Sequence, residues 1–343
     1  MTALQNRRIL GASALGFGLL LTAMARRARA PFAFHGKSVL ITGASRGLGL
    51  VLARRLAAEG AGLTLVARDK ADLERAADDM RRRWPAARVL IVAADIRERA
   101  NAERAVAAAI ERYGRIDVLL NNAGIIQVGP LEHMALSDYE EAMTTHFWAP
   151  LYMVLAALPH MRRQQAGRIV NISSIGGKIA VPHLVPYSAS KFALTGLSDG
   201  LRIELAHDNI TVTTVCPGLM RTGSPVNAMF KGKRAQEHAW FAIADSLPLV
   251  TIGAERAARQ IIAACRRGDA ELVITVPAKL AIVAHALVPE LFADAMTIIN
   301  RLLPSAAGHE GDVAQRGEVS AAGWATSTLM APTYAAARRN NEL

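Results

Sequence analysis

The sequence predicts an α/β fold in which a doubly wound parallel sheet is covered by helices on both faces. Short apolar runs rich in β-branched residues alternate along the chain with amphipathic helical patterns, as is typical of such sheets. A glycine-rich turn, residues 43–49, joins the first apolar run to the first helical pattern. Polar residues follow several runs directly, where the carboxyl ends of parallel strands form ligand sites.

The composition limits the classes of function. The 343 residues are 52% hydrophobic, enough to bury one large core. A formal net charge of +11 suits nucleic acid, anionic lipid or an anionic cofactor. The arginines alternate with acids in helical patterns, without a basic strip interleaved with aromatics, so we expect no nucleic-acid partner. The two cysteines, Cys216 and Cys265, form no disulfide or metal framework, which fits a reducing compartment.

Residues 1–30 are predicted to be a hydrophobic anchor. Residues 9–25 carry no charge, and as a helix they would reach roughly 26 Å, slightly short of a bilayer core of about 30 Å. Arginines flank the run on both sides, and the positive-inside rule favours membrane association with the rest of the protein in the cytoplasm. The alternative is a secretory signal peptide, since residues 28–30 are A-R-A, although Pro31 and the arginines are atypical of a cleavage site.

The first predicted strand, residues 37–42, leads into the glycine turn. The turn has the spacing G-x-x-x-G-x-G, and Leu48 begins a series of apolar residues at helical spacing. Helix N-termini attract phosphate through free N–H groups and the helix dipole, and glycine permits a pyrophosphate to approach the backbone closely. The turn therefore predicts a dinucleotide site, with a purely structural turn as the alternative.

The end of the second predicted strand, residues 63–66, indicates which dinucleotide is bound. An arginine at this position suits a 2′-phosphate, whereas an acid would bind a ribose 2′-hydroxyl. Arg68 stands there, and Arg46 in the glycine turn adds a second cation. Asp69 is interpreted as the cap of a helix that begins near Lys70. NADP(H) is therefore favoured over NAD(H).

Two further strands are expected at residues 88–94 and 117–120, on either side of a helical pattern at residues 102–110. Asp95 follows the first, where its carboxylate can meet an adenine amino group or simply cap the next helix. Asn122 follows the second and can form hydrogen bonds across neighbouring strands. Small residues beside it allow a flat ligand to lie against the backbone.

A candidate acid/base site follows the next strand, residues 168–170. That strand leads into Ser173 and Ser174, which places a hydroxyl at a strand's carboxyl end. Tyr187 and Lys191 are four residues apart and share one helix face. A tyrosine beside an ammonium group is easier to deprotonate, so Tyr187 is a candidate general acid/base. A packed tyrosine beside a solvated lysine is the alternative for the pair alone.

Five motifs in order carry a family resemblance: T-G-A-S-R-G-L-G at 42–49, N-N-A-G at 121–124, Ser174, Y-S-A-S-K at 187–191 and P-G at 217–218. Over roughly residues 37–275 the chain resembles the short-chain dehydrogenase/reductase family. The resemblance implies a Rossmann-type fold, a nicotinamide cofactor, and hydride transfer between the nicotinamide ring and a carbonyl or alcohol carbon. We expect the strand order 3-2-1-4-5-6-7.

The resemblance also implies residue roles. Tyr187 would be the proton donor or acceptor, Ser174 would orient the substrate oxygen, and Lys191 would hold the nicotinamide ribose and lower the tyrosine's pKa. A thirteen-residue separation from Tyr187 selects Ser174 over Ser173, which is left as a strand-packing serine. The cofactor-binding residues expected from the motifs and from the strand ends are Gly43, Ser45, Arg46, Gly47, Leu48, Gly49, Arg68, Asp95, Ile96, Asn122, Ala123, Gly124, Tyr187, Lys191, Pro217, Gly218 and Thr222.

One position departs from the family pattern. The helix after Ser137 usually carries an asparagine that holds a water linking the lysine to solvent, and His146 stands at that position. A histidine can also bind water, so His146 is a candidate member of a proton relay. The alternative is a histidine that is merely packed in a helix.

The substrate side is expected to be apolar. Residues 209–216 and 271–275 are predicted to be the sixth and seventh strands, with a helix at residues 254–266 between them. Residues 219–250 are predicted to form a lid over the pocket, with core packing of a lid helix as the alternative. The lid residues expected to make the pocket hydrophobic are Met220, Met229, Phe230, Trp240 and Phe241.

The remaining chain extends beyond the resemblance. Residues 278–303 predict an amphipathic helix, interrupted at Pro289, whose charges argue against spanning and favour an interfacial or pocket-covering position. Residues 305–343 are rich in Gly, Ser, Ala and charges without periodicity, which predicts a mostly flexible tail.

The combined prediction is an NADP(H)-dependent oxidoreductase that acts on a hydrophobic alcohol or carbonyl compound. The alternative is a membrane-tethered NADP(H)-binding protein without turnover, suggested by His146 and the long tail. Expected partners are a hydrophobic small-molecule substrate, a lipid bilayer and, as a homo-oligomer, further copies of the chain.

Overall fold

The computed structural model describes residues 32–247, 251–320 and 331–343. The chain divides into two compact units, Met1–Ala33 and Phe34–Leu343, and every described strand and helix belongs to the second. The predicted anchor, residues 9–25, and the signal-peptide alternative lie outside the described residues. Within the described ranges, no helix has both the length and the apolar character needed to cross a bilayer.

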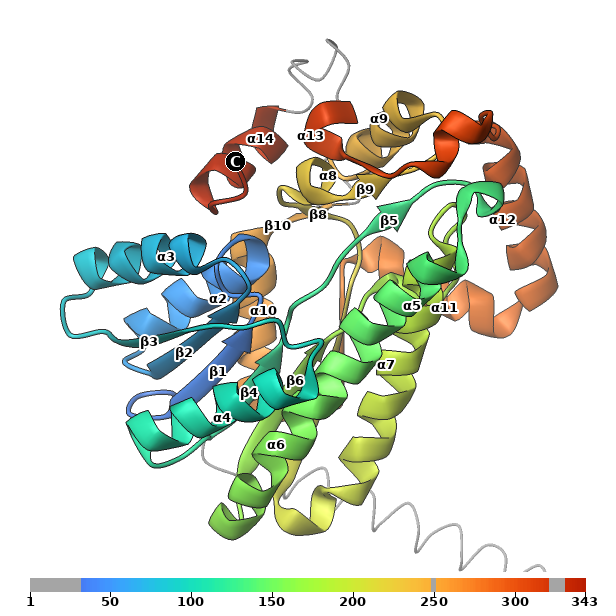
Figure 1. Cartoon of the computed structure of the whole chain (residues 1–343). Helices are drawn as coiled ribbons and strands as arrows, with labels where there is room; N and C mark the ends of the chain where they lie inside the picture. The colour runs from blue at the N-terminus through green and yellow to red at the C-terminus, as the bar shows by residue number, and fades with distance from the viewer. Residues whose placement is uncertain (1–31, 248–250, 321–330) are drawn as a thin grey trace, which may run out of the picture. The chain divides into compact units, whose positions relative to one another are not determined.

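The central sheet has seven parallel strands in the order β11-β7-β6-β4-β1-β2-β3 (Figure 1). Numbered among themselves, the strands follow the predicted order, and their bounds differ from the predicted ones by at most two residues. The strands are β1 (Ser38–Thr42), β2 (Gly62–Ala67), β3 (Arg88–Ala93), β4 (Val118–Asn121), β6 (Gly167–Ile172), β7 (Ile210–Pro217) and β11 (Glu271–Ile274).

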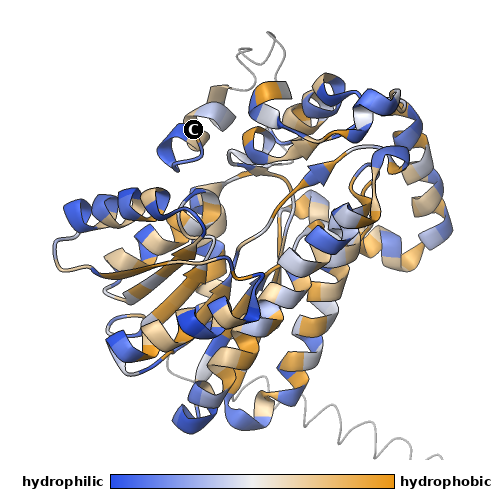
Figure 2. Ribbon diagram, viewed as in Figure 1, coloured by the Kyte–Doolittle hydropathy of each residue, from blue (hydrophilic) through white to orange (hydrophobic). Residues whose placement is uncertain are grey.

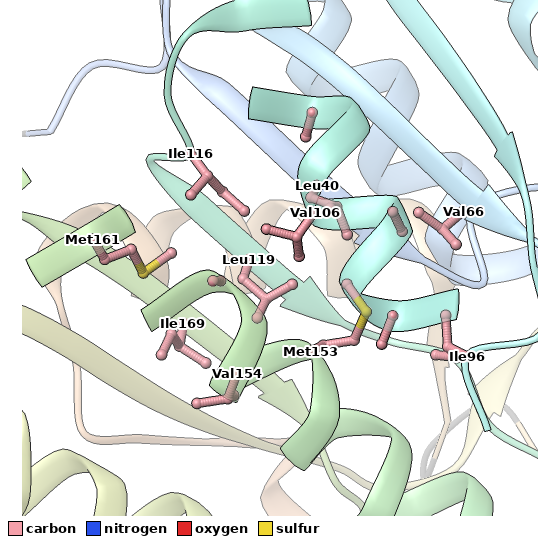
Figure 3. Packing of buried hydrophobic residues seen from close by; sticks show 14 of the residues in the cluster. Leu40, Val66, Ile96, Val106, Ile116, Leu119, Met153, Val154, Met161 and Ile169 are labelled. Atoms are coloured by element: carbon pink, nitrogen blue, oxygen red, sulfur yellow. The ribbon is translucent and has the colours of Figure 1, made fainter. Parts of the chain in front are cut away.

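Helices cover both faces of the sheet (Figure 1). On one face α4, α6 and α7 enclose a core in which Leu40, Val106, Met153 and Ile169 pack together (Figure 3). The central strands are mainly apolar (Figure 2), because both of their faces are buried. The helices of the first face are α4 (Arg99–Tyr113), α6 (Ala149–Gln164) and α7 (Val185–Glu204), and those of the second are α2 (Gly47–Ala58), α3 (Lys70–Arg83) and α10 (Ala254–Arg267).

Short elements, most of which the sequence did not predict, surround the carboxyl edge of the sheet. Three two-residue strands, β5 (Gln127–Val128), β9 (Met229–Phe230) and β12 (Gln315–Arg316), form a second sheet, and β8 (Met220–Arg221) pairs with β10 (Ile252–Gly253). The remaining helices and helical turns of this part are η1 (Leu131–His133), α5 (Leu136–Met143), η2 (Thr144–Trp148), η3 (Ile175–Gly177), α8 (Ser224–Asn227), α9 (Arg234–Ala244) and η5 (His309–Asp312). A further turn, η4 (Ala206–Asp208), joins α7 to the amino end of β7.

The predicted helix at residues 278–303 is two helices, α11 (Val276–Leu287) and α12 (Pro289–Leu302). Pro289 begins the second because the first turn of a helix needs no backbone N–H there. Neither helix contributes to the pocket wall, so the pocket-covering alternative is wrong. Large apolar side chains such as Leu280, Leu291 and Leu302 are exposed on these helices, and the interfacial position stays a prediction.

The prediction of a mostly flexible tail at residues 305–343 is wrong for its described parts. β12 pairs with β9, and α13 (Gly317–Ser320) follows it. In α14 (Ala331–Arg339) the side chains of Thr333, Ala336 and Ala337 are buried. Small side chains supply no hydrophobic periodicity, but they allow a helix to approach the protein closely, and hydrogen bonds then hold it.

Candidate functional site

A pocket of about 930 Å³ opens at the carboxyl edge of the central sheet. This volume is at the upper end of the range for small-molecule sites, about 300–1,000 Å³. All predicted catalytic and cofactor residues except Gly49 line it. The structure therefore brings together motifs that are spread over nearly 180 residues of sequence.

The glycine turn is shaped by close contacts between backbone atoms. Gly43 has a φ of +65°, and a Cβ there would lie 2.8 Å from the Cα of Ala123. A Cβ on Gly49 would lie 2.1 Å from the Gly43 carbonyl oxygen and 2.6 Å from Asn122 Nδ2. Gly49 therefore lies beneath the turn and shapes it, and unlike its neighbours it forms no part of the pocket wall.

The N-terminus of α2 offers an anion site. Within the described residues, the N–H groups of Leu48 and Gly49 donate to no acceptor, as is usual in the first turn of a helix. Arg46 and Arg68 also line the pocket. The Asp69 carboxylate accepts a hydrogen bond from Asp72 N–H at 2.9 Å, which confirms its interpretation as the cap of α3. Free N–H groups and two arginines fit a phosphate-bearing cofactor.

Asp95 is paired with Arg97, which sequence reasoning missed. Arg97 donates to the Asp95 carboxylate from Nε and from Nη2, the latter at 2.7 Å. Burial works to raise the pKa of Asp95, but these bonds and the charge of Arg97 hold it below its usual value. The carboxylate is therefore ionised and held in place by its neighbour, a pairing that a cap interpretation alone does not predict.

Asn122 connects neighbouring strands, as predicted. Its Nδ2 donates to the carbonyls of Thr42 and Gly43 at 3.1 and 3.2 Å, and its own N–H donates to Thr42 Oγ1 at 3.0 Å. Gly124, two residues on, is exposed to the pocket. These contacts join the end of β4 to the start of the glycine turn.

The two serines after β6 have different surroundings. The Ser173 hydroxyl is buried and bonds to the Lys191 carbonyl at 3.1 Å and to Thr195 Oγ1 at 2.9 Å, so Ser173 is the packing serine, as predicted. The Ser174 hydroxyl accepts a hydrogen bond from Gly176 N–H at 3.0 Å and lies at the pocket beside Tyr187. Ser174 is thus the serine whose side chain contacts Tyr187.

The protonation of Tyr187 and Lys191 differs from the prediction. Burial raises the pKa of Tyr187 to about 12, and the adjacent Ser174 hydroxyl only partly offsets this. Burial lowers the pKa of Lys191 to about 7. Lys191 Nζ donates to the Ile172 carbonyl at 2.9 Å and lies 5.7 Å from the centroid of the tyrosine ring. The expectation that the pKa of Tyr187 is lowered is therefore wrong, because the desolvation of its phenol raises the pKa by more than a distant ammonium group can lower it.

His146 is a buried, neutral link between two elements. It lies in the π-helical turn η2, where its Nε2 accepts a hydrogen bond from Ile125 N–H at 3.1 Å. Its Nδ1 therefore carries the proton and donates to Ser190 Oγ at 2.8 Å, while Ser190 donates to the Tyr187 carbonyl at 2.8 Å. Burial and the charge of Lys191 lower the pKa of His146 well below 6.5. Neither nitrogen is open to water in this arrangement, so the packed-histidine alternative describes its contacts.

The remaining wall of the pocket is mainly apolar. Four of the five predicted lid residues line it, whereas Phe230 is fully buried in a neighbouring cluster. Thr222, with its hydroxyl 2.6 Å from Ser224 Oγ, continues the wall after Pro217 and Gly218. The carboxyl groups of Asp245 and Glu342, which no sequence pattern singles out, also line the pocket. Burial and the charge of Glu342 raise the pKa of Asp245 to about 8.

Comparison with known sequences places this pocket in context. A sequence model described as short chain dehydrogenase matches residues 37–231. A protein of Anopheles gambiae named "Dehydrogenase/reductase SDR family protein 7-like" is 37% identical over 217 residues, which are 62% of this chain and 68% of the relative. The "11-beta-hydroxysteroid dehydrogenase A" of Sesamum indicum is 35% identical over 246 residues, 71% of this chain and 69% of the relative.

Solved structures show the same fold. L-sorbose reductase from Gluconobacter frateurii, solved with NADPH and L-sorbose, has a TM-score of 0.64 at 26% identity and covers 71% of this chain and 97% of its own. A short chain dehydrogenase/reductase from Burkholderia phymatum, solved with NAD, has a TM-score of 0.67 at 24% identity and covers 76% and 96%. The second likeness concerns the fold alone.

Proposed function

The chain belongs to the short-chain dehydrogenase family, and from this premise we propose that it transfers hydride between NADP(H) and a hydrophobic alcohol or carbonyl compound. Its place in the family makes it a nicotinamide-dependent oxidoreductase acting on CH–OH or C=O groups. The observation that carries the finer proposal is that Ser174, Tyr187 and Lys191 line the same pocket as the glycine turn.

The proposed chemistry assigns each polar residue one task. A bound nicotinamide cofactor would supply or accept the hydride. In the direction of reduction, the Ser174 hydroxyl donates a hydrogen bond to the carbonyl oxygen, and Tyr187 gives its proton to that oxygen as the carbon gains hydride. The raised pKa of Tyr187 supports this direction, because the phenol keeps its proton at neutral pH. Lys191, with two N–H donors beyond its bond to Ile172, would hold the ribose.

The preference for NADP(H) rests on Arg46 and Arg68. Both line the pocket near the end of β2, where the adenosine ribose of a dinucleotide lies in this class of fold. A guanidinium recognises a 2′-phosphate through charge-assisted hydrogen bonds that NAD(H) cannot offer. The NADPH in the sorbose reductase structure agrees with this preference, while the Burkholderia structure holds NAD.

A hydrophobic substrate is proposed from the apolar part of the pocket wall, where Phe241 belongs to the cluster against which Tyr187 and Trp240 pack. Met220, Met229, Trp240 and Phe241 line the pocket there, and an apolar substrate is stabilised by removing such surface from water. Glu237, fully buried, accepts a hydrogen bond from Trp240 Nε1 at 2.7 Å and fixes the indole ring. A rigid aromatic side chain of this kind limits the shape of the substrate.

We also propose that residues 1–30 attach the enzyme to a membrane with the catalytic unit in the cytoplasm. Support comes from the uncharged run at residues 9–25 and its flanking arginines. The exposed apolar side chains of α11 and α12 add a second surface for an interface between water and lipid. The expected homo-oligomer stays a prediction.

The experiment is an assay of NADPH absorbance with a panel of lipophilic ketones and aldehydes, comparing the full-length protein with Tyr187→Phe. Turnover should fall by about 10²- to 10⁴-fold, the usual contribution of a general acid. The dissociation constant for NADPH should change far less than turnover does, because the ring and its packing remain and only one hydroxyl of the cofactor site is lost. Near-normal turnover in the variant would exclude Tyr187 as the acid. Cofactor binding without turnover on any compound would favour the binding protein without catalysis.

A further inference from the structure

The end of the chain lies on the glycine turn. α14 brings the C-terminus beside α2 and α3 (Figure 1). Thr333 in α14 contacts Ser246 at the end of α9, with 2.9 Å between the two hydroxyl oxygens. The carbonyl of Asn340 then accepts a hydrogen bond from the Gly47 N–H at 2.9 Å. Residues 340–343, here termed the docked tail, thus occupy a donor at the N-terminus of α2.

Side chains of α2 and α3 hold the docked tail in place. Arg54 donates to Asn340 Oδ1 at 3.1 Å, and Arg75 donates to Asn341 Oδ1 at 3.2 Å. The other end of the Asn341 amide donates to the Ser45 carbonyl at 3.0 Å. The tail is therefore bound through polar groups of the same turn that the cofactor needs.

The Glu342 side chain crosses the pocket. One carboxylate oxygen accepts a hydrogen bond from Gly223 N–H at 2.7 Å, on the segment that follows Thr222. The other carboxylate oxygen, Oε1, lies beside the glycine turn, where a Cβ added to Gly47 would be 2.9 Å from it. Burial raises the pKa of Glu342 to about 7, and the bond from Gly223 and the charge of Arg46 act in the opposite direction. A carboxyl group is thus placed between the glycine turn and the segment after β7.

We infer that the docked tail is an internal competitor for the cofactor's diphosphate. The inference rests on the proposed function, since it takes this pocket to be the NADP(H) site. A carboxylate and a phosphate are attracted by the same groups, a helix N-terminus and an arginine, here Gly47 and Arg46. The two cannot share these groups, because like charges at contact distance repel. The cofactor therefore binds the fraction of molecules in which residues 340–343 have left the pocket.

The test compares NADPH binding by the full-length protein, a deletion of residues 340–343, and Glu342→Gln. If the tail is docked about nine-tenths of the time, the deletion should lower the dissociation constant about tenfold, since the apparent constant is the intrinsic one divided by the competent fraction. Glu342→Gln keeps an acceptor for the Gly223 N–H but loses the charge. It should lower the constant about threefold, because a neutral hydrogen bond is roughly half as strong as a charge-assisted one. The matched control is Glu318→Gln, which neutralises an exposed glutamate of α13 and should change nothing.

The outcomes separate this inference from the proposed function. Fluorescence titration with NADPH and with NADH gives the dissociation constants, and thermal melts show whether the deletion folds. If it does not, Glu342→Gln decides. Equal affinity for NADPH in all four proteins would overturn the competition and leave the function intact. Weaker binding after deletion would overturn it as well, and would make the tail part of the cofactor site. If no protein binds either nucleotide, both proposals fall.

Discussion

His146 should make the stability of the folded protein depend on pH. Its Nε2 accepts the hydrogen bond of Ile125, so a proton on that nitrogen would break the bond and bring two N–H groups together. Burial is the main reason that its pKa lies well below 6.5, and the charge of Lys191 adds to it. Replacement by asparagine keeps an acceptor for Ile125 and removes the titrating group.

The sign and size of the effect are set by proton linkage. Near pH 6.5 the unfolded chain begins to bind a proton at this histidine while the folded protein does not. The contribution to stability is therefore fully present well above pH 6.5 and is lost as the pH falls from there towards the folded pKa. Between pH 7.5 and 5.5 this loss amounts to about 1.4 kcal/mol for one histidine that stays neutral when folded.

The assay is urea unfolding of the full-length protein and of His146→Asn at both pH values. On going from pH 7.5 to 5.5, the native protein should lose about 1.4 kcal/mol more of its free energy of unfolding than the variant does. His285→Asn, which removes an exposed histidine from α11, corrects for the effect of such a substitution as a whole. A difference between native protein and variant that is the same at both pH values would refute the neutral imidazole and, with it, the assigned tautomer.

Three further expectations concern the cofactor site and the first residues. Arg68→Ala should weaken NADPH binding roughly ten- to a hundredfold and NADH binding little, because only NADPH offers a charge-assisted bond worth about 1.5–3 kcal/mol; equal losses in titrations with both nucleotides would contradict the 2′-phosphate assignment. Gly49→Ala places a methyl group 2.1 Å from the Gly43 carbonyl oxygen, so chemical denaturation should show a loss of about 1–3 kcal/mol, and an unchanged midpoint would refute the tight turn. Deletion of residues 1–30 should move the protein from the membrane fraction to the soluble one while NADPH binding persists; full-length protein found wholly in the soluble fraction would exclude the anchor.

The sheet could be predicted because its central strands are buried on both faces. Residues 39–41 of β1 are fully buried, and such strands appear in a sequence as unbroken apolar runs. β8, β9, β10 and β12 have two residues each, too few to show a period. Their pairing is decided by backbone segments that tertiary packing brings together, such as residues 315–316 against residues 229–230.

The candidate site shows the same division between local and distant information. The glycine turn and the Tyr187–Lys191 pair are local patterns. Their residues lie within one turn or one helix, so the sequence spacing predicts that they are close in the structure. Glu342 reaches the pocket through a bond to Gly223, 119 residues away in the chain, and nothing near it in sequence marks it. The sequence does not reveal such a residue, because its carboxylate is bound by a backbone N–H group, and every segment of the chain carries such groups.

The charge state of the Tyr187–Lys191 pair shows where spacing alone gives the wrong sign. An ammonium one helical turn away lowers a phenol's pKa only if the ammonium is charged and close. Here burial lowers the pKa of Lys191 to about 7 and raises that of Tyr187 to about 12, since a low-dielectric site disfavours both charged forms. The protein's own groups therefore keep the phenol protonated at neutral pH, which is the form that the proposed reduction requires. Oxidation of an alcohol starts from the phenolate, which is the form that the same surroundings disfavour.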